Sequence, residues 1–305
     1  MTQIEIFIKM TVVFYWLGVF LAILAGSTTQ SGSVLQKKVV NEVSEEAKFM
    51  KSLVKQPLWI LGVILSFGVS SIFYLTAQLF IGPALIPGLM AFGLIVLALG
   101  SVKIVGEKLK TEEIIGIILM ILGTFFLGVS GLSIDITETN LLELGFIIRT
   151  IVFTIIIVFL SLICHIFQKR VEKFKGILLA VLSGFMFALS NFWVSPLMGV
   201  ITDIFSGTFN LAQIAIFITS IIILILTNVI GLATIQLAYR VGQASNMVPI
   251  QNVPTLITPI FIYFLIFLLA PPSIFSVIYL ITGIILIGTS SFLLGKRSAQ
   301  MEEIK

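Results

Sequence analysis

The sequence predicts an all-α integral membrane protein, a bundle of nine transmembrane helices. Of its 305 residues, 58% are hydrophobic and only 10% are charged, against about 25% charged in a soluble domain. The mean hydropathy is +1.18, and apolar runs of about 20 residues, long enough to cross a bilayer as helices, follow one another along the chain. Such runs are too long for barrel strands, so only helices satisfy the backbone in lipid.

Charged residues, proline or glycine bound each apolar run. The predicted helices cover residues 12–36, 57–80, 83–105, 112–131, 145–167, 174–200, 211–239, 244–269 and 273–295. The first run resembles a signal peptide, because Ala25 and Gly26 make a passable cleavage site. Since a similar segment recurs later in the chain, we expect a permanent helix. Thr111, Glu112 and Glu113 are typical of a capped helix start, with the acids at the positive end of the helix dipole.

The positive charges predict the topology, because Lys and Arg collect on the cytoplasmic side of a membrane. The odd-numbered connections and the C-terminus hold 16 of the 18 Lys and Arg residues, which leaves Lys9 and Arg149 for the other side. We therefore expect an outside N-terminus and a cytoplasmic C-terminus, in the cell membrane. The net charge of +4 is a topology signal, and no nucleic-acid partner is expected.

The charged and thiol residues restrict the chemistry. We expect all 14 Asp and Glu residues, among them Asp135 and Glu138, to lie in loops or tails, so that no span contains a carboxylate. A single cysteine, Cys164, and a single histidine, His165, exclude an internal disulfide and a Cys/His zinc site. His165 and Arg149 are interpreted as interfacial residues near the two ends of helix 145–167. The sequence therefore predicts no enzyme, no cofactor and no direct carboxylate metal site.

An internal repeat is the most informative pattern. Residues 21–26 match residues 179–184, and Gln78 matches Gln236, both at an offset of 158. Residues 84–87 match 246–249, and residues 121–124 match 286–289. The order predicts a first four-helix repeat over 1–131, a linker helix over 132–172, and a second repeat over 173–305. Because one extra span separates the two units, the second enters the membrane from the opposite side, which is a common transporter design.

Short motifs identify a family resemblance. Gly106-Glu107-Lys108-Leu109, followed by the glycine-spaced helix of Gly116, Gly123 and Gly128, resembles the end of a repeat in the drug/metabolite transporter (DMT, EamA-like) superfamily. Residues 32–38, and Gln236 through Asn246-Met247-Val248-Pro249, resemble the NIPA-type magnesium transporter branch. The resemblance implies a DMT-like transporter fold with Mg²⁺ as one substrate, and it supplies no ligand set.

Polar residues within the spans are the candidate site. A run of Ser and Thr with Gln30 fills residues 27–33, where it serves either a water-accessible cavity or helix packing. Pro249, Pro254 and Pro259 recur in helix 244–269 and free backbone carbonyls, either as cation ligands or as an inert kink. The candidate substrate-binding residues are Thr28, Gln30, Gln78, Asn191, Asn228, Gln236, Asn246, Gln251 and Asn252.

Two substrate classes remain for a transporter that alternates access to a central site. One is hydrated Mg²⁺, held through its waters by neutral oxygens, and the resemblance favours it. The other is a small neutral polar metabolite held by hydrogen bonds. A non-transporting membrane scaffold is a second alternative, in which the polar residues only join helices. The expected partners are a small solute or hydrated Mg²⁺ and the lipid bilayer, and a homodimer is left open.

Overall fold

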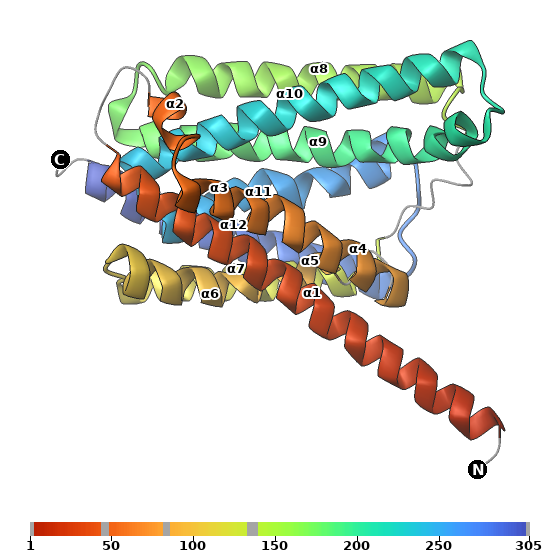
Figure 1. The fold of residues 1–305 in the computed structure, drawn as a ribbon, viewed down its shortest axis with the longest axis horizontal. Coiled ribbons are helices and arrows are strands. Elements are labelled where there is room, and N and C mark those ends of the chain that lie inside the picture. The colour runs from red at the N-terminus through yellow and green to blue at the C-terminus, as the bar shows by residue number, and fades with distance from the viewer. Residues whose placement is uncertain (1–2, 44–48, 82–85, 133–139, 303–305) are drawn as a thin grey trace. The chain divides into compact units, whose positions relative to one another are not determined.

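The computed structural model describes residues 3–43, 49–81, 86–132 and 140–302. Asp135 and Glu138, and the first part of the repeat match at residues 84–87, lie outside the described residues. Within them the chain forms helices and no strands (Figure 1). The elements are α1 Gln3–Glu42, α2 Phe49–Leu53, α3 Pro57–Val63, η1 Ile64–Val69, α4 Ser70–Ile81, α5 Ile86–Met90, α6 Gly93–Gly100, η2 Ser101–Val105, α7 Thr111–Val129, α8 Leu144–Phe167, η3 Glu172–Phe174, α9 Lys175–Ser206, α10 Leu211–Val241, α11 Ala244–Phe261, η4 Ile262–Ile266 and α12 Ile274–Glu302.

Eight segments of the described chain are long and apolar enough to cross a membrane. They match eight of the nine predicted spans, with the first extended to Glu42 and the sixth to Ser206. The remaining prediction, one continuous helix over residues 83–105, is not confirmed. The described chain forms α5, a turn at Ala91 and Phe92, and a separate apolar helix over Gly93–Val105. Glycine weakens a helix, and Gly88 and Gly93 flank this break.

The chain divides into two compact units, which are described separately. Unit 1 contains residues 1–132, 243–249 and 272–297. Unit 2 contains residues 133–242, 250–271 and 298–305. These units group residues by proximity and are not the sequence repeats, whose predicted boundaries at residues 131 and 172 stay a prediction. The division falls within α11, directly after Pro249.

In unit 1, α1 packs against α3, η1 and α4 and also against α5 and α6. Glycines let these backbones approach closely. A Cβ on Gly26 would lie 2.6 Å from Met90 Cα, and one on Gly62 would lie 2.8 Å from the Gly32 carbonyl oxygen. η1 is a π-helical turn that joins α3 and α4 into one continuous helix.

Unit 1 also pairs α7 with α12 in antiparallel fashion. A Cβ on Gly116 would lie 2.8 Å from Leu294 Cγ, and a Cβ on Gly123 would lie 2.8 Å from Ile287 Cγ1. The contact therefore moves backwards along α12 as it moves forwards along α7. Ser290 Oγ donates to the Gly116 carbonyl oxygen at 2.6 Å and ties the two helices. Small residues that allow such close packing are common between membrane helices.

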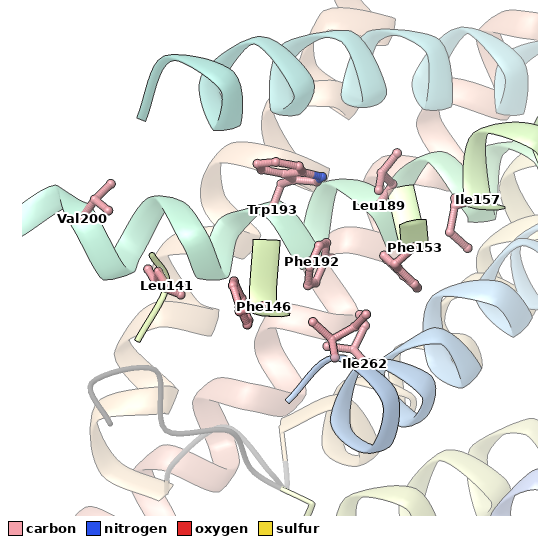
Figure 2. Packing of buried hydrophobic residues seen from close by; sticks show 10 residues of the cluster. Leu141, Phe146, Phe153, Ile157, Leu189, Phe192, Trp193, Val200 and Ile262 are labelled. Carbon is pink, nitrogen blue, oxygen red and sulfur yellow. The ribbon is translucent and has the colours of Figure 1, made fainter. Parts of the chain in front are cut away.

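In unit 2, α9 packs against both α8 and α10. Aromatic and aliphatic side chains form the core of unit 2 (Figure 2). The rings of Phe153 and Phe192 meet edge to face with their centroids 4.9 Å apart, a geometry that aromatic pairs prefer. Trp193 Nε1 donates to Thr154 Oγ1 at 3.2 Å. The core residues are Leu141, Phe146, Phe153, Ile157, Leu189, Phe192, Trp193, Val200, Ile262 and Ile266.

Candidate functional site

The hydroxyls in α1 mainly join helices. Thr28 Oγ1 donates to Leu24 O at 2.7 Å within its own helix. Thr29 Oγ1 and Ser70 Oγ lie 2.5 Å apart, and Ser70 Oγ also bonds Ala25 O at 2.9 Å. Ser66 Oγ donates to Thr29 O at 3.0 Å. The face of α1 toward η1 and α4 is therefore a hydrogen-bonded seam, as expected for the packing role of this run.

Gln30 is different from these hydroxyls. Its side chain is 7% exposed, and its Oε1 makes no hydrogen bond within the part of the chain that the structure describes. Its neighbours on the same helix face are Gly26, which packs on Met90 and Gly93, and Val34, which packs on Gly100. An unpaired buried carbonyl costs free energy, so this atom is suited to a water or solute. Gln78, also in unit 1, is half-buried.

The predicted amides of α9 and α10 in unit 2 have diverse environments. Asn228 Nδ2 donates to Ser190 Oγ at 2.6 Å and to Leu224 O at 2.8 Å. Gln236 is fully buried and has an interaction partner. Asn191, expected to be a buried amide, is exposed on α9. Ser190 and Phe192, on either side of it, occupy the inward positions, because neighbouring helix residues point about 100° apart.

Gln251 belongs to a three-residue relay in unit 2. Its Nε2 donates to Ser183 Oγ at 3.2 Å, and Ser183 Oγ donates to the Gly231 carbonyl oxygen at 2.7 Å. Ser183 is fully buried, and Gln251 is half-buried. Gly184 lets α11 approach α9, since a Cβ there would clash with Gln251 O and lie 3.0 Å from Pro254 Cγ. Asn252, the next residue, is half-buried.

Asn246 contacts a carboxylate, which corrects one expectation. Glu113 lies in the first turn of α7, inside a candidate span, and its side chain is 0% exposed. Its Oε2 accepts from Lys110 N at 2.6 Å, and its Oε1 accepts from Asn246 Nδ2 at 2.8 Å. The prediction that no span contains a carboxylate is therefore wrong at this position. The helix start is capped as expected, through Glu113 rather than Thr111.

A second carboxylate, Glu107, holds the beginning of α11. Its Oε1 accepts from Ala244 N at 2.7 Å, and its Oε2 accepts from Ser245 Oγ at 2.8 Å and Ser245 N at 3.3 Å. The side chain is 8% exposed. Negative charge is favourable at a helix N-terminus, where backbone N–H groups are unpaired. Glu107 thus stabilises the first turn of the helix that carries Asn246.

A comparison with protein families gives a match over almost the whole chain. The family model of the magnesium transporter NIPA matches residues 13–300. The chain belongs to the NIPA family. No curated protein and no solved structure matches it. The NIPA resemblance noted in its short motifs is confirmed, and a multi-pass membrane transporter follows from the family together with the eight apolar spans.

The structure assigns the predicted NIPA site residues to both units. Unit 1 contains Thr28, Gln30, Gln78 and Asn246. Unit 2 contains Asn191, Asn228, Gln236, Gln251 and Asn252. The described residues contain no group of three or more His, Cys, Asp or Glu side chains that could hold a metal ion. The predicted site residues are eight amides and one threonine, whose neutral oxygens can accept hydrogen bonds from water.

Sequence reasoning missed the three polar residues that organise α11 in this NIPA protein. Glu107 and Ser183 were not candidates, and Glu113 was interpreted only as a helix cap. The position of Gly106-Glu107 before α7 gives no hint of Ala244, 137 residues away. Arg149 also differs from expectation, because it is half-buried and its Nε donates to Ile266 O at 2.9 Å. His165 is exposed at the end of α8, as an interfacial residue would be.

Proposed function

We propose that this NIPA protein moves Mg²⁺ across a membrane through a central site lined by amides and hydroxyls, by alternating access. The match of the magnesium transporter family over residues 13–300 carries the proposal. Mg²⁺ dehydrates reluctantly and is readily held through its waters. Amide and hydroxyl oxygens, such as Gln30 Oε1 in unit 1, accept hydrogen bonds from such waters.

Related contacts in the two units support an inverted repeat as the basis of alternating access. Gly26 packs tightly on Met90, and Gly93 packs on Gly26. Gly184 packs in the same way on Gln251 and Pro254. Gln251 follows Met90, and Pro254 follows Gly93, by 161 residues, and Gly184 follows Gly26 by 158. The π-helical turns η2 and η4 begin at Ser101 and Ile262, again 161 residues apart. Two halves with the same internal geometry are what an inverted-repeat transporter requires.

The proposed topology places the N-terminus outside and the C-terminus in the cytoplasm of a cell-membrane protein. The antiparallel pairing of α7 with α12 in unit 1 agrees with four spans between these two helices. The distribution of Lys and Arg favours the same orientation. Under this topology a negative-inside membrane potential drives Mg²⁺ inward.

The two buried carboxylates have structural roles that are compatible with the proposed mechanism. Glu107 and Glu113 accept hydrogen bonds from the first turn of α11 and from Lys110, so both act in holding that helix. Transport of a small neutral polar metabolite, held by hydrogen bonds, stays the alternative, because amides carry both donors and acceptors.

Flux measurements test the proposal. Purified protein in liposomes loaded with a Mg²⁺-sensitive dye is expected to admit Mg²⁺ when an inside-negative potential is imposed. Gln30→Ala removes the unpaired buried carbonyl and is expected to reduce entry about tenfold, the effect of about 1.4 kcal/mol of lost binding. Thr289→Ala, which removes an exposed hydroxyl bonded only to its own helix, is the matched control. Folded wild-type protein that gives no flux above empty liposomes would contradict the proposal and favour the metabolite.

A further inference from the structure

We propose that Ser183 fixes the hydrogen-bond polarity of Gln251, so that this part of the site presents acceptor oxygens to ligands that carry donors, such as hydrated Mg²⁺. The inference rests on the proposed function and assigns Ser183 as a positioning residue for it. Gln251 is then the residue that contacts the ligand. All the groups involved belong to unit 2.

The single proton of Ser183 determines the arrangement. Its hydroxyl is fully buried and donates to the Gly231 carbonyl oxygen at 2.7 Å. A serine hydroxyl has one proton and two acceptor lone pairs. Once the proton is directed at Gly231, the oxygen can only accept from Gln251, which approaches at 3.2 Å.

The Gln251 amide is thereby oriented. Its NH₂ group must face Ser183, so its Oε1 lies on the opposite side of the amide. The side chain is half-buried, and Oε1 makes no hydrogen bond with the described residues. A rotated amide would place Oε1 against Ser183 Oγ, so that two acceptors face each other and the hydrogen bond is lost, which costs free energy at a buried hydroxyl.

Thr255 presents the same polarity one turn further along α11. Its hydroxyl donates to Gly184 O at 3.3 Å and to Gln251 O at 3.4 Å. The proton is thus committed to the backbone, and the oxygen keeps its lone pairs for a ligand. Residues four apart share a helix face, so Gln251 and Thr255 offer acceptors side by side. A carboxylate or phosphate finds only the second N–H of the Gln251 amide as a donor in this pair, whereas metal-bound water supplies donors for both acceptor oxygens.

The experiment uses hexaamminecobalt(III), an inert cation whose whole surface consists of N–H donors, beside Mg²⁺ itself. In wild type the cobalt complex is expected to inhibit Mg²⁺ entry competitively. Ser183→Ala removes the partner that orients Gln251, so KM for Mg²⁺ and the inhibition constant are both expected to rise about fivefold, with kcat nearly unchanged. Ser161→Ala is the matched control, because Ser161 is a buried serine of unit 2 that bonds only Ile157 of its own helix.

Gln251→Glu is the second variant, and it keeps acceptor oxygens on both arms of the side chain. It is expected to bind hexaamminecobalt(III) at least as tightly as wild type. If Ser183→Ala lowers kcat but leaves KM and the inhibition constant unchanged, Ser183 has a structural role only and the inference is overturned. Weaker binding of the cobalt complex by Gln251→Glu would also overturn it. Calorimetric binding of the cobalt complex to purified protein keeps the test valid if Mg²⁺ flux itself is absent, in which case only the proposed function fails.

Discussion

Gly26→Ala is expected to destabilise the protein by about 3 kcal/mol, near the upper end for overpacked interiors. An added Cβ would clash with the Met90 carbonyl oxygen and lie 2.6 Å and 2.7 Å from Met90 Cα and C. These are backbone atoms of α5, which cannot rotate away as a side chain can. Gly93 packs on the Gly26 carbonyl oxygen from the same side, so shifting α5 disturbs a second contact. The loss of stability is measured by unfolding the protein in detergent micelles that contain an increasing fraction of SDS.

Gly288→Ala is the matched control for this prediction. Gly288 lies within α12, and a Cβ there would meet no heavy atom within 4 Å. Alanine is favoured over glycine in a helix by about 1 kcal/mol, so the same substitution is expected to be neutral or slightly stabilising. Equal stability of the two variants would refute the close backbone contact between α1 and α5.

Glu107→Ala is expected to lower stability by about 2–3 kcal/mol and to loosen the beginning of α11. The change removes the carboxylate that accepts hydrogen bonds from the backbone N–H groups of Ala244 and Ser245 and from the Ser245 hydroxyl. Buried donors left without partners cost about 1–3 kcal/mol, and hydrogen bonds to a charged carboxylate are the stronger kind. Thermal unfolding measures the stability, and hydrogen exchange of a peptide that covers residues 243–249 measures the local loosening.

Glu112→Ala is the control for Glu107→Ala, because Glu112 is exposed in the first turn of α7. Its removal is expected to change stability by less than about 0.5 kcal/mol. The loss of stability in Glu107→Gln, which keeps an acceptor oxygen, is expected to lie between those of Glu112→Ala and Glu107→Ala. Faster exchange confined to residues 243–249 in Glu107→Ala supports the contact, and unchanged exchange there would disprove it.

The sequence predicted the helices well because their signal is local. Apolar runs bounded by Pro57, Lys110 or Arg240 mark the ends of spans regardless of how the spans pack. Its failure over residues 83–105 has a tertiary reason. The hydropathy there continues through Ala91 and Phe92, whereas the turn lies beside the tight contact of Gly93 with Gly26, which no window of neighbouring residues reveals.

The burial of the candidate amides was easier to predict than their contacts. An amide within a span needs partners, which correctly marked Gln236, Asn246 and Gln251 as buried or half-buried. The facing direction of Asn191 depends on a rotation of about 100° between neighbouring residues, and the sequence left it open. Glu113 was misjudged because a charged residue at a helix start is usually solvated, whereas here it pairs with Asn246, 133 residues away.

The π-helical turn η1 has a consequence for helical phase. A π-turn holds one extra residue, so every position beyond it is rotated by about 100° relative to an uninterrupted α-helix. Gly62 and Ser66 face α1 before the turn is complete, and Ser70, Ala77 and Ile81 continue that face after it. A regular α-helix of the same residues would present to α1 the side chains one position earlier along α4. Deleting a single residue between Ile64 and Val69 is therefore expected to give a regular helix in which Ser70 still faces the Ala25 carbonyl oxygen, because the deletion removes the residue that the π-turn accommodates.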